Sequence, residues 1–237
     1  MGRYIFWDFD NTLAYRAGMW GQVIYELIRK AGCVEVSLEE IRQHLKHGFP
    51  WHSPEQAHSE FFKGVSWWEH MTLHFSEIIR ATGVEAELSD RLARQIKQKY
   101  LDITQWHVYD DAVPCLEIAQ SRGYSNVIVS NHVPELAQLV NALGMGRYFT
   151  QVFSSAALGF EKPNIQLYRK VLSMFSDISE VTMIGDSYQA DILGAKNAGI
   201  NAVLVRAENI NNYKYYCKDL KGIFNVLETA AQPWMAY

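Results

Sequence analysis

Acidic side chains directly follow two apolar segments of the chain. Asp8 and Asp10 come after the run Tyr4 to Trp7, and Asp186 comes after the run Val181 to Ile184 and one glycine. Carboxylates that gather at one place cannot all stay ionised without a counter-charge, and their oxygens are ligands that Mg²⁺ accepts together with water and substrate oxygens. The two segments therefore predict a magnesium site, with Asp8 and Asp186 as its best ligands.

A hydroxyl, an amide and an ammonium group accompany these carboxylates. Ser130 and Asn131 follow a third apolar segment, and Lys162 precedes a proline that can open a helix. Mg²⁺ and Lys162 would neutralise the oxygens of a phosphoryl group, while the backbone N–H groups after Asp8 and Ser130 can donate hydrogen bonds to them. This set of groups predicts a site for a phosphate ester.

The elements that must position these residues alternate between helix and strand after Trp106. The residue patterns predict helices over 112–121, 135–143, 165–175 and 190–198, and strands over 126–129, 152–153, 181–184 and 202–205. With a first strand at 4–7, this alternation predicts an α/β fold whose core is a Rossmann-like, doubly wound parallel sheet. Such a sheet binds ligands beyond the carboxyl ends of its strands, where the acidic and phosphate-binding candidates fall.

The stretch from about Ala14 to Trp106 reads as successive helices without a strand. We therefore expect a core of residues 1–13 and 107–237, with residues 14–106 inserted as an all-helical cap domain that can cover the site. Trp51 lies in a proline-flanked loop of this insert. It is a candidate substrate contact, and a packing anchor between cap helices is the competing interpretation.

The acidic and phosphate-binding segments also occur in an order that resembles the four motifs of the haloacid dehalogenase (HAD) superfamily. The matching segments are Asp8-Phe9-Asp10-Asn11-Thr12, Ser130-Asn131, Glu161-Lys162-Pro163 and Gly185-Asp186-Ser187 with Asp191. The flanking runs 153–163 and 186–199 resemble the phosphatase-like branch of the superfamily, and the insert resembles its type-one cap. The resemblance thus covers the core on both sides of the insert.

The resemblance implies catalytic roles for four residues. Asp8 would be the nucleophile that forms an aspartyl-phosphate, and Asp10 would protonate the leaving alcohol and later activate water. Thr12 would orient Asp10, and Lys162 would stabilise Asp8 and the phosphate. The chemistry agrees, because a carboxylate nucleophile divides hydrolysis into two displacements and one acid can serve as the base for the second.

The resemblance also implies ligands for the substrate and the metal. Ser130 and Asn131 would bind the transferring phosphoryl group. Mg²⁺ would be held by Asp8, by Asp186 and by the backbone carbonyl of Asp10, with Asp191 in direct contact or one layer further out.

Composition and charge narrow the partners that we expect. The 237 residues are 49% hydrophobic, which suffices for a buried core, and the formal net charge of -4 comes without a long basic run. The lack of a long basic run argues against a protein that binds nucleic acid or a membrane surface. A small-molecule phosphate ester is therefore the favoured substrate. Asp8 ends the first apolar run too early for a signal peptide or a membrane span, so we expect a cytoplasmic protein.

We therefore expect a magnesium-dependent phosphatase that hydrolyses a small-molecule phosphate monoester through an aspartyl-phosphate. A phosphomutase acting on a sugar phosphate uses the same groups and is one alternative. A non-catalytic binding protein with a HAD fold is the other. The sequence leaves open which alcohol carries the phosphate, and it leaves the oligomeric state open.

Overall fold

The structure, a computed structural model, describes residues 2–58, 61 and 64–230. Its centre is a six-stranded sheet in the order β5-β4-β1-β6-β7-β8, and every neighbouring pair of strands is parallel. The strands are β1 (Gly2–Trp7), β4 (Tyr124–Ser130), β5 (Gln151–Ser154), β6 (Ile178–Gly185), β7 (Asn201–Val205) and β8 (Tyr216–Cys217). The strand order reverses at β1, because the chain adds β4 and β5 on one side of it and then β6, β7 and β8 on the other. This confirms the predicted doubly wound parallel sheet.

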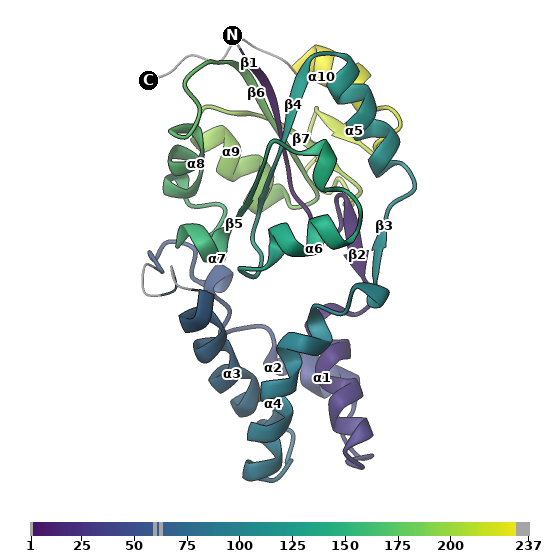
Figure 1. Ribbon diagram of the computed structural model, residues 1–237, viewed down its shortest axis with the longest axis vertical. Coiled ribbons are helices and arrows are strands. Elements are labelled where there is room, and N and C mark those ends of the chain that lie inside the picture. The colour runs from purple at the N-terminus through teal and green to yellow at the C-terminus, as the bar shows by residue number, and fades with distance from the viewer. Residues whose placement is uncertain (1, 59–60, 62–63, 231–237) are drawn as a thin grey trace.

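Both faces of the sheet are covered by helices (Figure 1). Successive side chains of a strand point to opposite faces, so Ile5 and Trp7 belong to one hydrophobic core whereas Phe6 belongs to the other. The first core receives α5 (Ala112–Ser121), α6 (Leu136–Ala142) and α10 (Ile223–Ala230), and the second receives α7 (Ser155–Leu158), α8 (Ile165–Leu172), the π-helical turn η5 (Tyr188–Leu193) and α9 (Gly194–Asn197). Burial on both faces explains why the strands read as continuous apolar runs.

The predicted helices and strands after Trp106 are present, with ends that differ by a few residues. The segment predicted as one helix over 190–198 is built from η5 and α9. The short strand β8 and the helices α7 and α10 were not predicted.

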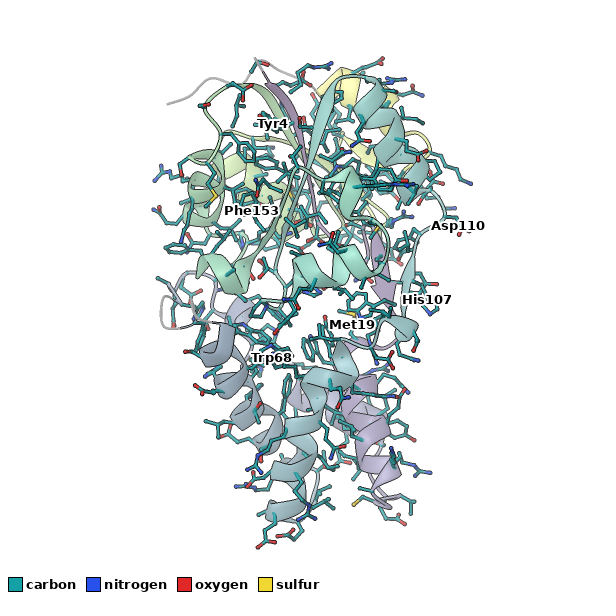
Figure 2. All side chains as sticks on the ribbon, in the orientation of Figure 1. Tyr4, Met19, Trp68, His107, Asp110 and Phe153 are labelled. Carbon is teal, nitrogen blue, oxygen red and sulfur yellow. The ribbon has the colours of Figure 1, made fainter. Side chains whose placement is uncertain are left out.

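Four helices of the insert lie beyond the carboxyl ends of the strands (Figure 1). They are α1 (Met19–Lys30), α2 (Leu38–His44), α3 (Gly64–Ala81) and α4 (Ala86–Tyr100). The rings of Trp20 and Tyr100 join α1 to α4 by stacking in parallel, with centroids 3.7 Å apart. Figure 2 shows Met19 and Trp68 at the level where these helices face the sheet. Within the described ranges, none of the helices combines the length and the apolar character that crossing a bilayer requires.

The expectation that residues 14–106 contain no strand is wrong. Strand β2 (Ala14–Arg16) pairs antiparallel with β3 (Trp106–Val108), so the insert leaves and rejoins the core as a two-stranded ribbon. Strands of three residues are too short to show an alternating pattern, and these two form because the chain returns to the point at which it left. The predicted boundaries after residues 13 and 106 fall at this ribbon.

Candidate active site

The turn after β1 places Asp8 and Asp10 at the carboxyl edge of the sheet. The backbone N–H of Asp8 still donates to the Ile184 carbonyl in β6 at 2.8 Å. The Phe9 carbonyl then accepts hydrogen bonds from the N–H groups of residues 12, 13 and 14, which closes a tight turn. Asn11 has a left-handed φ of 54° within it, a conformation that asparagine tolerates better than most residues. The turn therefore gives the carboxylates at i and i+2 access to one cavity.

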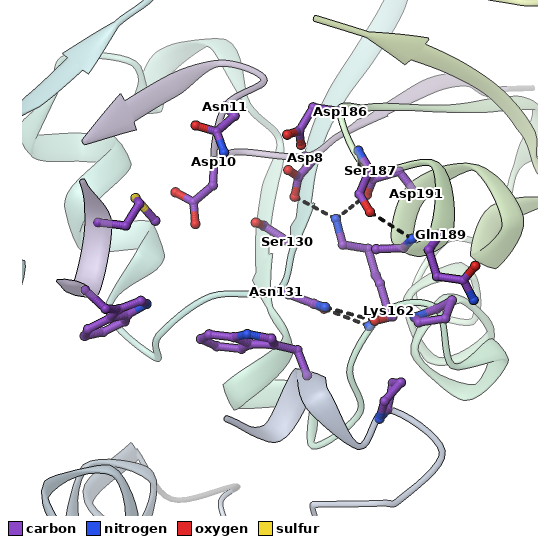
Figure 3. A pocket seen from close by; sticks show the side chains of 16 residues that line it. Asp8, Asp10, Asn11, Ser130, Asn131, Lys162, Asp186, Ser187, Gln189 and Asp191 are labelled. Atoms are coloured by element: carbon purple, nitrogen blue, oxygen red, sulfur yellow. Dashed lines mark hydrogen bonds and ion pairs between the residues drawn. The ribbon is translucent and has the colours of Figure 1, made fainter. Parts of the chain in front are cut away.

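Lys162 joins the two acidic segments. Its Nζ lies 2.6 Å from Asp8 Oδ1 and 2.5 Å from Asp191 Oδ1 (Figure 3), and the side chains of Lys162 and Asp191 are 2% and 1% exposed. Burial alone would lower the pKa of Lys162, but the carboxylates of Asp191 and Asp8 outweigh it and raise that pKa above its ordinary value. Lys162 therefore stays charged inside the protein.

The carboxylates outnumber this single ammonium group. One oxygen each of Asp8, Asp186 and Asp191 lies within 4.8 Å of the others. Burial, and then the charge of Asp8, raise the pKa values of Asp186 and Asp10. Burial also raises the pKa of Asp191, although Lys162 opposes this shift. Carboxylates whose charged forms are disfavoured by burial and by one another fit a divalent cation with oxygen ligands.

Ser130 and Asn131 have different surroundings at the end of β4. Ser130 lines the cavity, and its Oγ is buried without a hydrogen-bond partner among the described residues. The Asn131 amide is already paired, because its Nδ2 donates to the Lys162 carbonyl at 2.9 Å and its Oδ1 accepts from the Lys162 N–H at 2.7 Å. The Asn131 side chain thus holds the Lys162 backbone, which the sequence did not indicate.

The contact predicted between Thr12 and Asp10 is not formed in the described part of the chain. Thr12 is fully buried, and its Oγ1 has no partner there. The imidazole of His132 lies near Asp10 instead, with Nε2 3.8 Å from Asp10 Oδ1. Burial lowers the pKa of His132 to about 4, so this imidazole is neutral near pH 7.

Arg206 supports the same turn from the end of β7. Its Nε donates to the Thr12 carbonyl at 3.0 Å, and its guanidinium pairs with Asp111 and lies over the Tyr109 ring. Sequence reasoning missed this residue, because it is 194 positions away from the turn that it contacts.

The site opens into a cavity of about 510 Å³ between the sheet edge and the helical insert. All four aspartates of the predicted metal set line it, together with Ser130, Asn131 and Lys162 (Figure 3). Trp51 lines the cavity from the insert and also packs against the hydrophobic core, so its role as a substrate contact stays a prediction. The sequence indicated no role for the other lining residues, of which the first three belong to the motifs: Asn11, Pro163, Ser187, Met19, Trp20, Pro54, Gln189 and Ala190. Met19 and Trp20 begin an amphipathic helix, so their pattern indicates only packing.

The fold and the site define this protein as an α/β protein whose doubly wound parallel sheet carries an aspartate-lined cavity. The family model of haloacid dehalogenase-like hydrolases matches residues 3–199, and the chain belongs to that family. The resemblance of the four motifs is thereby confirmed.

Individual relatives match over most of the chain. Haloacid dehalogenase-like hydrolase domain-containing protein 3 of Mus musculus is 25% identical over 207 residues, which cover 86% of this chain and 81% of that protein. Phosphoserine phosphatase of Thermus thermophilus is 27% identical over 216 residues, which cover 84% of this chain and 86% of that protein. Among solved structures, the magnesium-bound HAD hydrolase YfnB of Bacillus subtilis has a TM-score of 0.68 at 18% identity, covering 96% of this chain and 99% of that one. At this identity the last match supports the fold alone.

Proposed function

We propose that this hydrolase is a magnesium-dependent phosphatase that forms an aspartyl-phosphate on Asp8. The observation that carries the proposal is the convergence of four carboxylates, the Lys162 ammonium and the unpartnered Ser130 hydroxyl on one cavity. Carboxylates would repel a phosphate dianion unless cations accompany it, whereas a lysine and a hydroxyl are suited to binding its oxygens. A relative is named a phosphatase, which agrees with this reaction.

The acidic cluster has the donor set that Mg²⁺ requires. Asp8 and Asp186 would hold the ion with the backbone carbonyl of Asp10, and Asp191 would assist them. All of these donors are oxygens, and the raised pKa values of Asp186 and Asp191 reflect burial among like charges. The ion would supply charge stabilisation and would orient the phosphoryl group for in-line attack.

The first step is a displacement at phosphorus by a carboxylate oxygen of Asp8. The bond from Asp8 to phosphorus forms while the ester P–O bond breaks, and Asp10 donates its proton to the departing alcohol oxygen. Asp10 can carry this proton, because burial and the charge of Asp8 raise its pKa well above the ordinary value. Lys162 and the Ser130 hydroxyl stabilise the charge on the transferring group.

In the second step, a water molecule attacks phosphorus and releases Asp8. Asp10, now a carboxylate, accepts the proton of this water, and phosphate departs. Residues 14–106 act as the cap that encloses the leaving alcohol, and Trp51 forms part of the cap surface that contacts this alcohol. The substrate is a small-molecule phosphate ester, and the protein acts in the cytoplasm.

The test is phosphate release from a panel of sugar phosphates, nucleoside monophosphates and short acid phosphates, with and without Mg²⁺. We expect release that needs Mg²⁺ and that is lost in Asp8→Asn. Asp110→Asn, at an exposed position outside the cavity, removes the same charge and should keep the activity. Substrate with a ³²P label should leave a hydroxylamine-sensitive label on the wild type and none on Asp8→Asn.

Two outcomes would contradict the proposal. Formation of a phosphate isomer without free phosphate would identify a phosphomutase. Binding of phosphate esters without turnover at saturating Mg²⁺ would identify a non-catalytic binding protein.

A further inference from the structure

The part of the cavity that faces the phosphate site from the insert is apolar and aromatic. Met19, Trp20, Trp51 and Pro54 line it there, and none of the four carries a charge. Cavities of this kind bind the apolar part of a ligand and leave orientation to a few polar groups. The leaving alcohol would therefore meet a surface suited to an apolar or aromatic group.

Trp51 is held in a fixed orientation at this surface. Its ring stacks on Phe49 with centroids 4.4 Å apart and planes 14° apart, and Phe49 packs in turn against Trp20 at 5.4 Å. Phe49 is buried, whereas Trp51 is only partly buried and lines the cavity. One face of the Trp51 ring is thus covered, so a flat ring bound in the cavity could continue the stack on the remaining surface.

The cavity has no spare cation for a second negative group. Among the described residues that line it, Lys162 alone carries a positive charge, and its Nζ is already bound to Asp8 and Asp191. The other charged lining residues are the four aspartates. A leaving group with a carboxylate or a second phosphate would be desolvated beside acidic residues without a partner.

The size of the cavity also favours a leaving group larger than a two-carbon acid. A volume of about 510 Å³ falls within the range of about 300–1,000 Å³ that is typical for drug-sized ligands. A two-carbon acid would leave most of the aromatic surface uncovered.

We propose that the alcohol released by this enzyme is uncharged and carries a flat ring that stacks on Trp51. Nucleoside 5′-monophosphates are the metabolites whose chemistry fits this site best. The inference rests on the phosphatase function proposed above and specifies the substrate class of the same cavity.

The experiment compares matched phosphate esters with the full-length chain and Mg²⁺. Benzyl phosphate and 4-carboxybenzyl phosphate differ by one carboxylate, while uridine 5′-monophosphate and 2-phosphoglycolate represent the two metabolite classes. We expect kcat/KM for benzyl phosphate to exceed that for 4-carboxybenzyl phosphate by about tenfold or more, because the added charge finds no partner. Uridine 5′-monophosphate should likewise exceed 2-phosphoglycolate.

Variants of Trp51 test the stacking. Truncation of a stacking aromatic side chain weakens base binding by roughly 5- to 150-fold. Trp51→Ala should therefore lower the ratio of kcat/KM for benzyl phosphate to that for methyl phosphate by about tenfold, whereas Trp51→Phe should keep it within about threefold. Gln56→Ala, an exposed change in the same loop outside the cavity, is the matched control and should leave the ratio unchanged.

The possible outcomes distinguish a failure of this inference from a failure of the proposed phosphatase function. Faster hydrolysis of 4-carboxybenzyl phosphate or 2-phosphoglycolate would overturn the inference and leave the phosphatase intact. An unchanged ratio in folded Trp51→Ala would do the same. Hydrolysis of none of the esters would overturn the proposed phosphatase and the inference with it.

Discussion

The Asn131→Ala variant tests whether this side chain holds Lys162 or binds substrate. The substitution removes both hydrogen bonds between the Asn131 amide and the Lys162 backbone, of 2.9 and 2.7 Å. Lys162 is 2% exposed, so its N–H and carbonyl would lose partners at a site with little access to water. A buried group left unsatisfied costs about 1–3 kcal/mol, so we expect the free energy of unfolding to fall by about 2–4 kcal/mol.

The loss should be measurable by urea unfolding and by heat. For a chain of this length it corresponds to a fall in Tm of roughly 5–12 °C. Because Lys162 would no longer be aligned on Asp8, kcat should fall as well. Asn197→Ala, at an exposed position of α9, is the control and should change the free energy of unfolding by less than about 0.5 kcal/mol. A raised KM with unchanged kcat and unchanged stability would contradict the structural role of Asn131 and would identify it as a substrate-binding residue.

Three further variants test the surrounding electrostatics and the insert. Glu161 is 1% exposed, and burial raises its pKa from 4.5 to about 7. The folded carboxyl therefore keeps its proton where the unfolded one has lost it, and wild-type stability falls by up to about 3 kcal/mol as pH rises from 4.5 to 7. Glu161→Gln should abolish this fall, as urea unfolding at pH 5 and pH 8 would reveal. Burial and the charge of Asp8 disfavour the charged form of Asp186, so Asp186→Asn should stabilise the metal-free protein at pH 8 by about 1–2 kcal/mol. The same variant should lose the rise in Tm that Mg²⁺ causes in the wild type, and an unchanged rise would exclude Asp186 as a ligand. Glu135 accepts from Trp68 Nε1 at 2.8 Å and pairs with Lys97 Nζ at 2.6 Å, so Glu135→Ala should speed hydrogen exchange in α3 and α4 while leaving β1 unchanged.

The sheet could be predicted because its strands are buried on both faces. Runs such as Ala202 to Val205 are apolar without interruption, and their alternation with helices implies parallel pairing. The ribbon of β2 and β3 gave no such signal. Tyr15 pairs with His107 only because the insert brings residues 92 positions apart together. Local patterns cannot report a strand whose sole support is this distant partner.

In the candidate site, too, some features could be predicted from the sequence and others could not. Asp8, Ser130 and Asp186 could be located because each lies at the carboxyl end of a strand, and these ends meet at one edge of the sheet. The partners of their neighbours could not be located, because hydrogen bonds depend on side-chain rotamers. Asn131 could equally have faced the phosphate, and Thr12 could have reached Asp10, until the packing of the turn fixed their directions.

The position of Lys162 explains how neighbouring carboxylates could take opposite roles. Lys162 is ion-paired with Asp8, which suits the proposed nucleophile because this carboxylate must attack in its charged form. Asp10 Oδ1 lies near the neutral His132, and burial together with the charge of Asp8 raises the pKa of Asp10, which suits the proposed acid. Environments that separate the protonation of two carboxylates let one attack in its charged form while the other donates a proton. The hydrogen bonds with Asn131 that hold the Lys162 backbone therefore support the proposed reaction by keeping the ammonium group beside Asp8.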